Sequence, residues 1–208
     1  MNTRRIVIAI TGASGSLYGV RLLEHLRTVS GVETHVIVSR AARQTLALET
    51  DLQPEAVEAL AHHAHSPTDI GAAVSSGSFR THGMVVAPCS VKTLSNIAWG
   101  NTGDLIARAA DVALKERRRV VLMLRETPLH TGHLESMLRV SQIGAIVFPP
   151  VPAFYNRPTR VQDIVDQSVM RCLDLLDVEC ESAPRWGETS RRLLRSAPAA
   201  ASAPIGAA

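Results

Sequence analysis

Aromatic residues are scarce in this sequence of 208 residues, where Phe, Tyr and Trp together make up 3%. Apolar residues of all kinds still make up 46%, which is ordinary for a globular domain and implies an aliphatic core. Few aromatic rings leave few platforms on which the bases of a single-stranded nucleic acid can stack. The scarcity argues against that class of binding protein.

A basic folded surface is also missing, although the sequence pI is about 9.1. Residues 185–208 contain four Arg and one Glu, a charge of +3 that equals the formal net charge of the whole chain. The rest of the chain is therefore balanced between acidic and basic residues. Because the basic excess belongs to the tail, we expect no nucleic-acid partner.

Paired cysteines and long apolar runs are absent as well. The odd set Cys89, Cys172 and Cys180 lacks the spacing of a metal or redox motif, which favours free thiols in a reducing cytosol. No apolar run reaches the roughly 18 residues that a membrane span needs, and the run before Gly12 is too short for a signal peptide. We expect a cytoplasmic protein.

What the sequence does contain is an alternation of apolar strands and amphipathic helices. Residues 5–11 form a continuous apolar run typical of a buried parallel strand. Leu17, Val20, Leu23 and Leu26 follow at helical spacing. Further strands are expected at 32–39, 84–88, 119–124 and 145–148, and helices at 16–29, 40–50, 91–98, 104–116 and 131–143, with others from Pro54 and Thr159. This alternation predicts an α/β fold with a Rossmann-like, doubly wound parallel sheet.

Two segments fall outside this pattern. Residues 62–83 are rich in Gly, Ser and His and are expected to be loop or irregular structure. Residues 183–208 are an Ala/Pro/Arg-rich tail that is expected to be partly disordered. We therefore predict a single domain over residues 1–182, followed by the tail.

Polar residues gather where the predicted strands end. The strand ends carry Thr11 to Ser14, then Ser39, then Ser90 to Thr93, then Arg125 with Glu126, and finally the segment that leads to Tyr155. In open parallel sheets, ligands bind beyond the carboxyl ends of the strands. Hydroxyls, amides and cations at five such ends predict a ligand that carries phosphate.

The first of these ends is the turn Gly12-Ala13-Ser14-Gly15. Its free amides and the helix dipole suit a phosphate, but it can equally be a plain turn with Ser14 or Ser16 as N-cap. It is not the dinucleotide fingerprint, and Ser39 stands where an NAD site has an acid. The pattern argues against NAD.

Arg125 and Glu126 form a charged pair directly after an apolar strand. At a strand mouth an Arg can clamp phosphate and a Glu can act as acid or base. The alternative is a surface ion pair.

Arg108 and Lys115 are seven apart, so they share one face of the expected helix. They can hold an anion together, but pairing of Asp104 with Arg108 and of Asp111 with Lys115 is the favoured interpretation.

Two further groups are interpreted as structural. Among His62, His63 and His65, adjacent histidines point apart, and no carboxylate stands at ligand spacing. This favours a loop over a metal site. Cys89 follows Pro88 at a strand end, but without an identifiable His partner it is expected to be a packed thiol rather than a nucleophile.

Five segments of the sequence carry a family resemblance. They are residues 12–15, 87–93, 105–112, 124–129 and 149–158, in that order. With them the chain resembles the UbiX-type flavin prenyltransferases, a group of flavoproteins, over about residues 4 to 178. This family joins a dimethylallyl group from dimethylallyl phosphate to N5 and C6 of reduced FMN, without a metal, and the prenylated FMN serves UbiD-type decarboxylases.

The resemblance implies site residues. The FMN site would be lined by Gly12, Ala13, Ser14, Ser39, Ser90, Val91, Lys92, Thr93 and Arg125. Tyr155, Arg171, Lys115 and Arg108 would bind dimethylallyl phosphate. The chemistry adds two roles: ring closure at C6 loses a proton and needs a base near the flavin, for which Glu126 is expected, with Ser14 as proton relay. Family members form dodecamers with sites at subunit contacts, so a homo-oligomer is expected.

The sequence departs from the family pattern at two positions. Val91 and Arg171 stand where the family often has Met and Lys. Arg keeps the charge and grips phosphate bidentately. Two alternatives stay open: a non-catalytic FMN-binding accessory subunit, and a flavin-dependent cysteine decarboxylase, although its Pro-x-Met-Asn motif is absent.

Overall fold

A six-stranded, fully parallel sheet forms the centre of the molecule, and a computed structural model describes it within residues 3–179. The strand order is β3-β2-β1-β4-β5-β6. This is the doubly wound order, in which strands are added outward on one side of β1 and then, from β4 on, outward on its other side. The strands are β1 (Arg4–Ile10), β2 (Val32–Val38), β3 (His63–His65), β4 (Gly83–Cys89), β5 (Arg119–Leu124) and β6 (Ile146–Val147). The predicted fold class is confirmed.

The central strands β1, β4 and β5 are apolar over most of their length because both faces of the sheet are covered. Along β1, Ile6, Ile8 and Ile10 belong to the core on one face, and Val7 and Ala9 belong to the core on the other. All five side chains are almost completely buried. The continuous run that predicted a parallel strand is thus explained by two separate cores.

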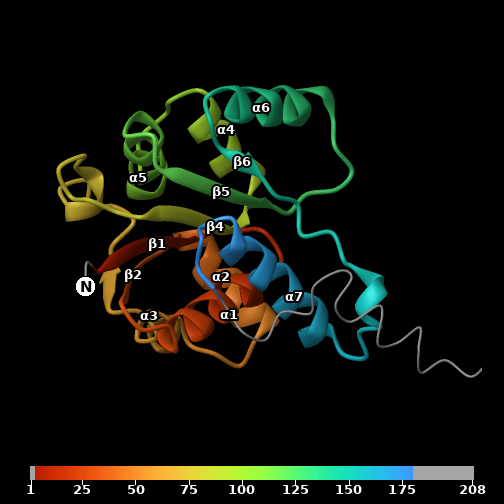
Figure 1. Cartoon of the computed structure of the whole chain (residues 1–208). Helices are drawn as coiled ribbons and strands as arrows, with labels where there is room; N and C mark the ends of the chain where they lie inside the picture. The colour runs from red at the N-terminus through yellow and green to blue at the C-terminus, as the bar shows by residue number, and fades with distance from the viewer. Residues whose placement is uncertain (1–2, 180–208) are drawn as a thin grey trace, which may run out of the picture.

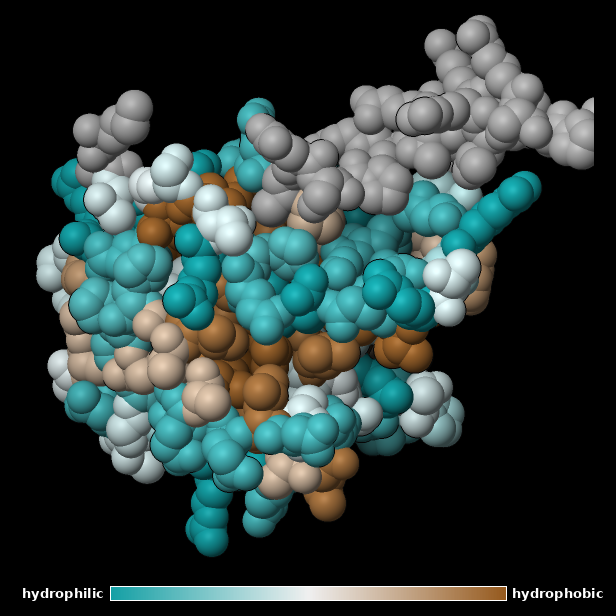
Figure 2. All heavy atoms as spheres, turned by 90° about the horizontal axis from the view of Figure 1, so that it is seen from below, coloured by the Kyte–Doolittle hydropathy of each residue, from teal (hydrophilic) through white to brown (hydrophobic). Residues whose placement is uncertain are grey.

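Helices cover the two faces unequally (Figure 1). One face carries α1 (Ser16–Arg27), α2 (Arg40–Glu49), α3 (Pro54–Glu58) and α7 (Val161–Asp174), and the other carries α4 (Val91–Ala98), α5 (Leu105–Lys115) and α6 (Thr131–Gln142). Seen from the α1 side, hydrophilic residues cover most of the surface, and hydrophobic residues show in a band across its middle (Figure 2).

Helix α1 packs closely on the sheet at Gly19. A Cβ at this position would lie 2.5 Å from the carbonyl oxygen of Ala87 and 2.7 Å from a side-chain carbon of Ile10. A larger residue would push the start of α1 away from β1 and β4. The turn before α1 therefore sits firmly over the carboxyl ends of these strands.

The prediction of loop or irregular structure over 62–83 was partly wrong. This segment contains the short edge strand β3 and a 3-10 turn, η1 (Ala73–Ser75). Strand β3 has no apolar pattern of its own and exists because it pairs with β2, with His63 opposite His35 and His65 opposite Ile37. A second 3-10 turn, η2 (Phe154–Asn156), follows the proline-rich segment.

Two further predictions concern the C-terminal tail and the absence of a membrane-spanning segment. The tail predicted over 183–208 lies outside the described residues. Within the described part of the chain, no helix combines the length and apolar character needed to cross a membrane.

Candidate functional site at the carboxyl edge of the sheet

A cleft of about 590 Å³ opens at the carboxyl edge of the sheet, beside the point where the strand order reverses. It is lined by the ends of β1, β2, β4 and β5 and by the helices that follow them. The nine residues expected to line a flavin site all lie on it, together with Glu126: Gly12, Ala13, Ser14, Ser39, Ser90, Val91, Lys92, Thr93 and Arg125. Residues separated by more than a hundred positions thus meet in one cleft.

Two helix N-termini point at this cleft. Ser39 is the N-cap of α2, where its Oγ accepts a hydrogen bond from the amide of Ala42 at 3.1 Å. Ser90 is the N-cap of α4, where its Oγ accepts from the amide of Thr93 at 3.3 Å and lies 3.1 Å from the Thr93 Oγ1. Helix N-termini carry partial positive charge and free amides. This part of the cleft suits a phosphate.

The walls of the cleft are tied together by hydrogen bonds between strand ends. The Thr11 hydroxyl donates to the carbonyl of Pro88 at 2.7 Å and accepts from the amide of Ser90 at 2.8 Å. On the other side, a Cβ at Gly12 would lie 2.3 Å from the Cβ of Ala41. Glycine is needed there because the turn lies against the start of α2.

Glu49, at the end of α2, holds the glycine turn beside the cleft, a role that sequence reasoning missed. Its carboxylate accepts hydrogen bonds from the amides of Gly15, at 3.0 Å, and Ser16, at 2.9 Å. Burial alone would raise the pKa of Glu49, but hydrogen bonds from Ser14, Ser16 and Gly15 outweigh it and hold the pKa below its usual range. The Glu49 carboxylate therefore occupies the N-terminus of α1, where the sequence analysis had considered a phosphate.

No local sequence pattern predicts the contact of Glu49 with the glycine turn, because the two are more than thirty residues apart. Its position also changes the expected ligand geometry. With the Gly15 and Ser16 amides satisfied, and with the Asp104 carboxylate capping α5, the N-termini of α2 and α4 are the ones that line the cleft without an acidic cap in the described part of the chain.

Arg125 and Glu126 stand at the mouth of the cleft, where β5 ends. The amide of Arg125 donates to the carbonyl of Cys89 at 3.0 Å, which fixes the chain at this point. The Glu126 carboxylate accepts from the amide of Thr127 at 2.9 Å. Neither Arg125 nor Lys92 forms an ion pair with another residue in the range 3–179. Both cations are available to an anionic ligand, and the surface ion pair considered from the sequence does not form.

Tyr155 and Arg171 lie in a different hollow of the same chain, of about 310 Å³, beside α7. Gln167 Nε2 donates to the Tyr155 hydroxyl at 3.2 Å, and Arg171 pairs with Asp174 at 2.5 Å. The structure brings these two residues, both expected to bind the prenyl donor, together, but it places them apart from the cleft at the carboxyl edge of their own chain.

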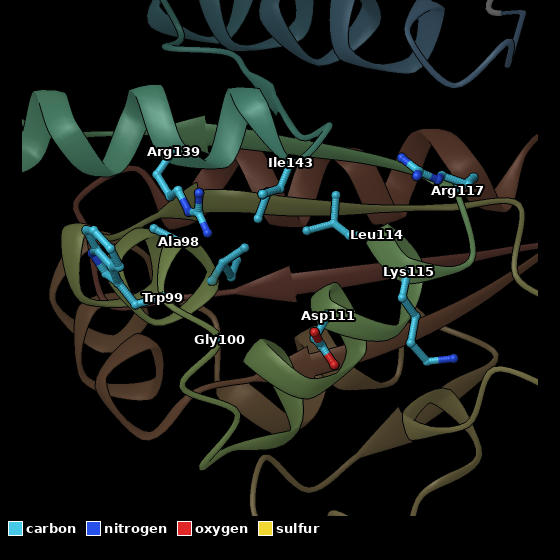
Figure 3. A pocket seen from close by; sticks show the side chains of 10 residues that line it. Ala98, Trp99, Gly100, Asp111, Leu114, Lys115, Arg117, Arg139 and Ile143 are labelled. Carbon is cyan, nitrogen blue, oxygen red and sulfur yellow. The ribbon is translucent and has the colours of Figure 1, made fainter.

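Arg108 and Lys115 are placed elsewhere again, on α5. Arg108 pairs with Asp111 at 2.8 Å, and Lys115 pairs with its neighbour Glu116. The expected pairs Asp104–Arg108 and Asp111–Lys115 were wrong, because Asp104 caps α5 by accepting from the amide of Ala107. Lys115 lies at the rim of a hollow of about 580 Å³ between α4, α5 and α6 (Figure 3).

Cys89 is a packed thiol, as predicted. It is fully buried, and burial raises the pKa of its thiol to about 12. A thiolate nucleophile at this position is therefore excluded near neutral pH.

Comparison with known proteins agrees with this site. A family model described as Flavoprotein matches residues 1–173. The chain belongs to the flavoprotein family. Within this family it is of the UbiX type: it is 56% identical over 171 residues to the flavin prenyltransferase UbiX of Escherichia coli K12, which covers 82% of this chain and 90% of that protein.

Solved structures give the same assignment. The chain superposes on AnUbiX, a structure in complex with FMN and dimethylallyl pyrophosphate, with a TM-score of 0.87 and 52% identity over 89% of this chain and 98% of that one. A dodecameric, FMN-dependent UbiX-like decarboxylase from Escherichia coli O157:H7 gives a TM-score of 0.86 and 49% identity over 88% and 98%. The resemblance inferred from five sequence segments is confirmed.

Proposed function

We propose that this flavoprotein is a flavin prenyltransferase, which joins the dimethylallyl group of dimethylallyl phosphate to N5 and C6 of reduced FMN. The observation that carries the proposal is the cleft at the carboxyl edge, where a phosphate site, an unpaired Arg125 and a carboxylate at Glu126 meet. The UbiX-type relatives bear the name of this activity, and AnUbiX was solved with FMN and a prenyl donor.

The residues of the cleft fit FMN. A volume of about 590 Å³ lies within the range of roughly 300–1,000 Å³ typical of small-molecule sites. The N-termini of α2 and α4, with the hydroxyls of Ser39, Ser90 and Thr93, suit its single phosphate. Gly12 and Ala13 offer backbone without bulk to the remainder. Bound FMN supplies the nucleophilic positions N5 and C6.

The charged residues at the mouth have separate roles in this proposal. In the reaction, the C–O bond of dimethylallyl phosphate breaks and the phosphate leaves with the electron pair, while a bond forms to N5, which gives up its proton. Ring closure then consumes the prenyl C=C bond, which takes up one proton as its other carbon bonds to C6. Arg125 stabilises the charge of the leaving phosphate. Closure at C6 releases a proton, which Glu126 accepts. The hydroxyl of Ser14, which is hydrogen-bonded to Glu49, assists as a proton relay.

The four remaining donor-binding candidates require more than one copy of the chain. Tyr155 and Arg171 line one hollow and Lys115 lines another, both separate from the cleft at the carboxyl edge. Arg108 lies on α5, where it pairs with Asp111. We therefore place the prenyl-donor site where copies of a homo-oligomer meet, so that neighbours supply these side chains. The dodecameric assembly of the Escherichia coli O157:H7 neighbour is the arrangement we propose.

The product implies a consumer. A prenylated flavin is a cofactor rather than an end product, and the proposed recipient is a UbiD-type decarboxylase. The proposed location is the cytoplasm, in keeping with the odd number of cysteines in the sequence and the two buried free thiols, Cys89 and Cys172.

The test is a mass spectrum of the flavin after anaerobic incubation of the purified protein with reduced FMN and dimethylallyl phosphate. The proposal expects a gain of one C5H8 unit on FMN. A protein that binds FMN and leaves its mass unchanged would be an accessory carrier. Release of CO2 from a peptidyl cysteine instead would identify a cysteine decarboxylase, and either result overturns the proposal.

A further inference from the structure

A cluster of one carboxylate and three imidazoles lies on β2 and β3, away from the carboxyl edge. His35 and Glu33 alternate on one face of β2, and the pairing of β2 with β3 places His63 directly opposite His35. His35 Nε2 lies 3.0 Å from Glu33 Oε1, and His63 Nε2 lies 3.3 Å from the same oxygen. Two imidazole nitrogens on adjacent strands therefore converge on one point.

The separations of 3.0 and 3.3 Å lie at or just below those between ligands of one metal ion, so a small outward shift of the rings makes room for an ion. In a tetrahedral site with bonds of about 2.0–2.2 Å, ligand atoms lie about 3.3–3.5 Å apart. The ligating atoms of Glu33, His35 and His63 all lie within 4.8 Å of one another, and this is the only such group among residues 3–179. The rings of His35 and His63 stack at 4.7 Å. His63 is half exposed, so its ring is free to tilt toward an ion.

The surroundings supply the outer contacts that metal sites use. His65 Nε2 lies 3.0 Å from His35 Nδ1, so the second nitrogen of this buried imidazole is held in place. Arg5 Nε lies 3.3 Å from Glu33 Oε1, and its guanidinium rests over the ring of Phe79. Arg5 contacts the same oxygen as the two imidazoles, so Glu33 Oε2 is the carboxylate oxygen left to bind an ion while Oε1 accepts from Arg5.

His62 is directed to the other face of the sheet. Its Nδ1 lies 3.1 Å from the amide of Thr34 and 2.9 Å from the Thr34 hydroxyl. The expectation that adjacent histidines point apart is confirmed. His62 therefore takes no part in the cluster, although it is next to His63 in the sequence.

We propose that Glu33, His35 and His63 form a binding site for one divalent transition-metal ion of the zinc class. Imidazole nitrogen with carboxylate oxygen is a donor set for such ions, and affinity for Co²⁺ and Zn²⁺ follows from the same ligands. Solvent completes the coordination on the exposed side of His63. The ion would join the edge strand β3 to β2. The proposed metal site is separate from the cleft at the carboxyl edge of the sheet and does not depend on the proposed activity.

The experiment measures Zn²⁺ binding by calorimetry on chelator-treated, tag-free protein, with Co²⁺ as a visible-absorption probe. The wild type is expected to bind one ion per chain, with tetrahedral Co²⁺ bands in the visible region. His63→Ala is expected to weaken Zn²⁺ binding at least tenfold, and His65→Ala, which removes an outer contact, by roughly tenfold to a hundredfold. Zn²⁺ should raise the Tm of the wild type and not that of His63→Ala.

His62→Gln is the matched control, because it changes the adjacent imidazole on the opposite face; it should bind Zn²⁺ as the wild type does. The pair His130 and His133, whose rings lie 3.6 Å apart at the start of α6, is the competing location. Equal Zn²⁺ affinity in His63→Ala and the wild type, or loss of binding in His133→Gln instead, overturns the proposal. His63→Ala should prenylate FMN at the wild-type rate, so failure of the metal site and of the proposed activity are distinguishable.

Discussion

The two parts of β2 show two ways in which this fold assembles polar side chains. Just beyond its carboxyl end, Ser39 joins residues from other strand ends in a cleft. Within the strand, Glu33 and His35 join His63 across a strand pair. The first group follows from where the strands stop, and the second from which residues lie opposite one another.

The comparison teaches why one group was visible in the sequence. All parallel strands end at the same edge, so any polar residue after an apolar run is a candidate for that edge. Register is different, because it depends on a pairing that a three-residue strand of alternating His and Ala does not announce. The histidines were therefore interpreted as a loop without a carboxylate, although Glu33 was available on the neighbouring strand.

The largest expected effect separates the two groups by chemistry. Glu126→Gln removes the proposed base, so formation of prenylated FMN should fall by roughly a hundredfold to ten-thousandfold, while FMN affinity stays the same. Mass spectrometry of the flavin and fluorescence titration measure the two quantities. Glu135→Gln, an exposed carboxylate on α6, is the control. A Glu126→Gln enzyme with the normal rate would show that another group accepts the proton.

Arg125→Ala should affect the carboxyl edge alone. Loss of a charge-assisted hydrogen bond costs about 1.5–3 kcal/mol. Cleavage of the C–O bond of dimethylallyl phosphate should therefore slow by about tenfold or more, with a smaller effect on the Kd for FMN. His63→Ala should leave both quantities unchanged. An equal loss in the two variants would break the distinction between cleft and histidine cluster.

Ser39 links the cleft to the stability of α2, and two substitutions separate its roles. Ser39→Ala removes an N-cap and should lower the free energy of unfolding by about 1 kcal/mol, whereas Ser39→Gly should cost only a few tenths. Both lose the hydroxyl and should weaken FMN binding alike. Urea denaturation and FMN titration measure the two effects. If FMN affinity follows stability instead, the hydroxyl does not contact the ligand.

The smallest effect concerns the pH dependence of Glu49. Because hydrogen bonds hold its pKa in the folded chain below the usual value, its stabilising contribution is present above the unfolded pKa of about 4.5 and is lost as the pH falls through the folded pKa. The difference in Tm between the wild type and Glu49→Gln should be constant from pH 7 to 5 and narrow at lower pH. A difference that grows on acidification would contradict this.

The sequence by itself determined the alternation of strands and helices, the doubly wound sheet and most of the residues that line the cleft at its carboxyl edge. Apolar runs report burial directly, and the ends of parallel strands lie together by geometry, so Ser39, Ser90 and Arg125 could be grouped without coordinates. Five segments in a fixed order then sufficed to recognise the family.

Only the tertiary structure decided the contacts between residues that no local pattern connects. It placed Glu49 on the first helix N-terminus, paired Arg108 with Asp111 rather than Asp104, and set Tyr155 and Arg171 apart from the cleft of their own chain. It also brought His63 to Glu33. The physical reason is the same in each case, because such contacts depend on strand register and helix docking, which sequence spacing does not encode.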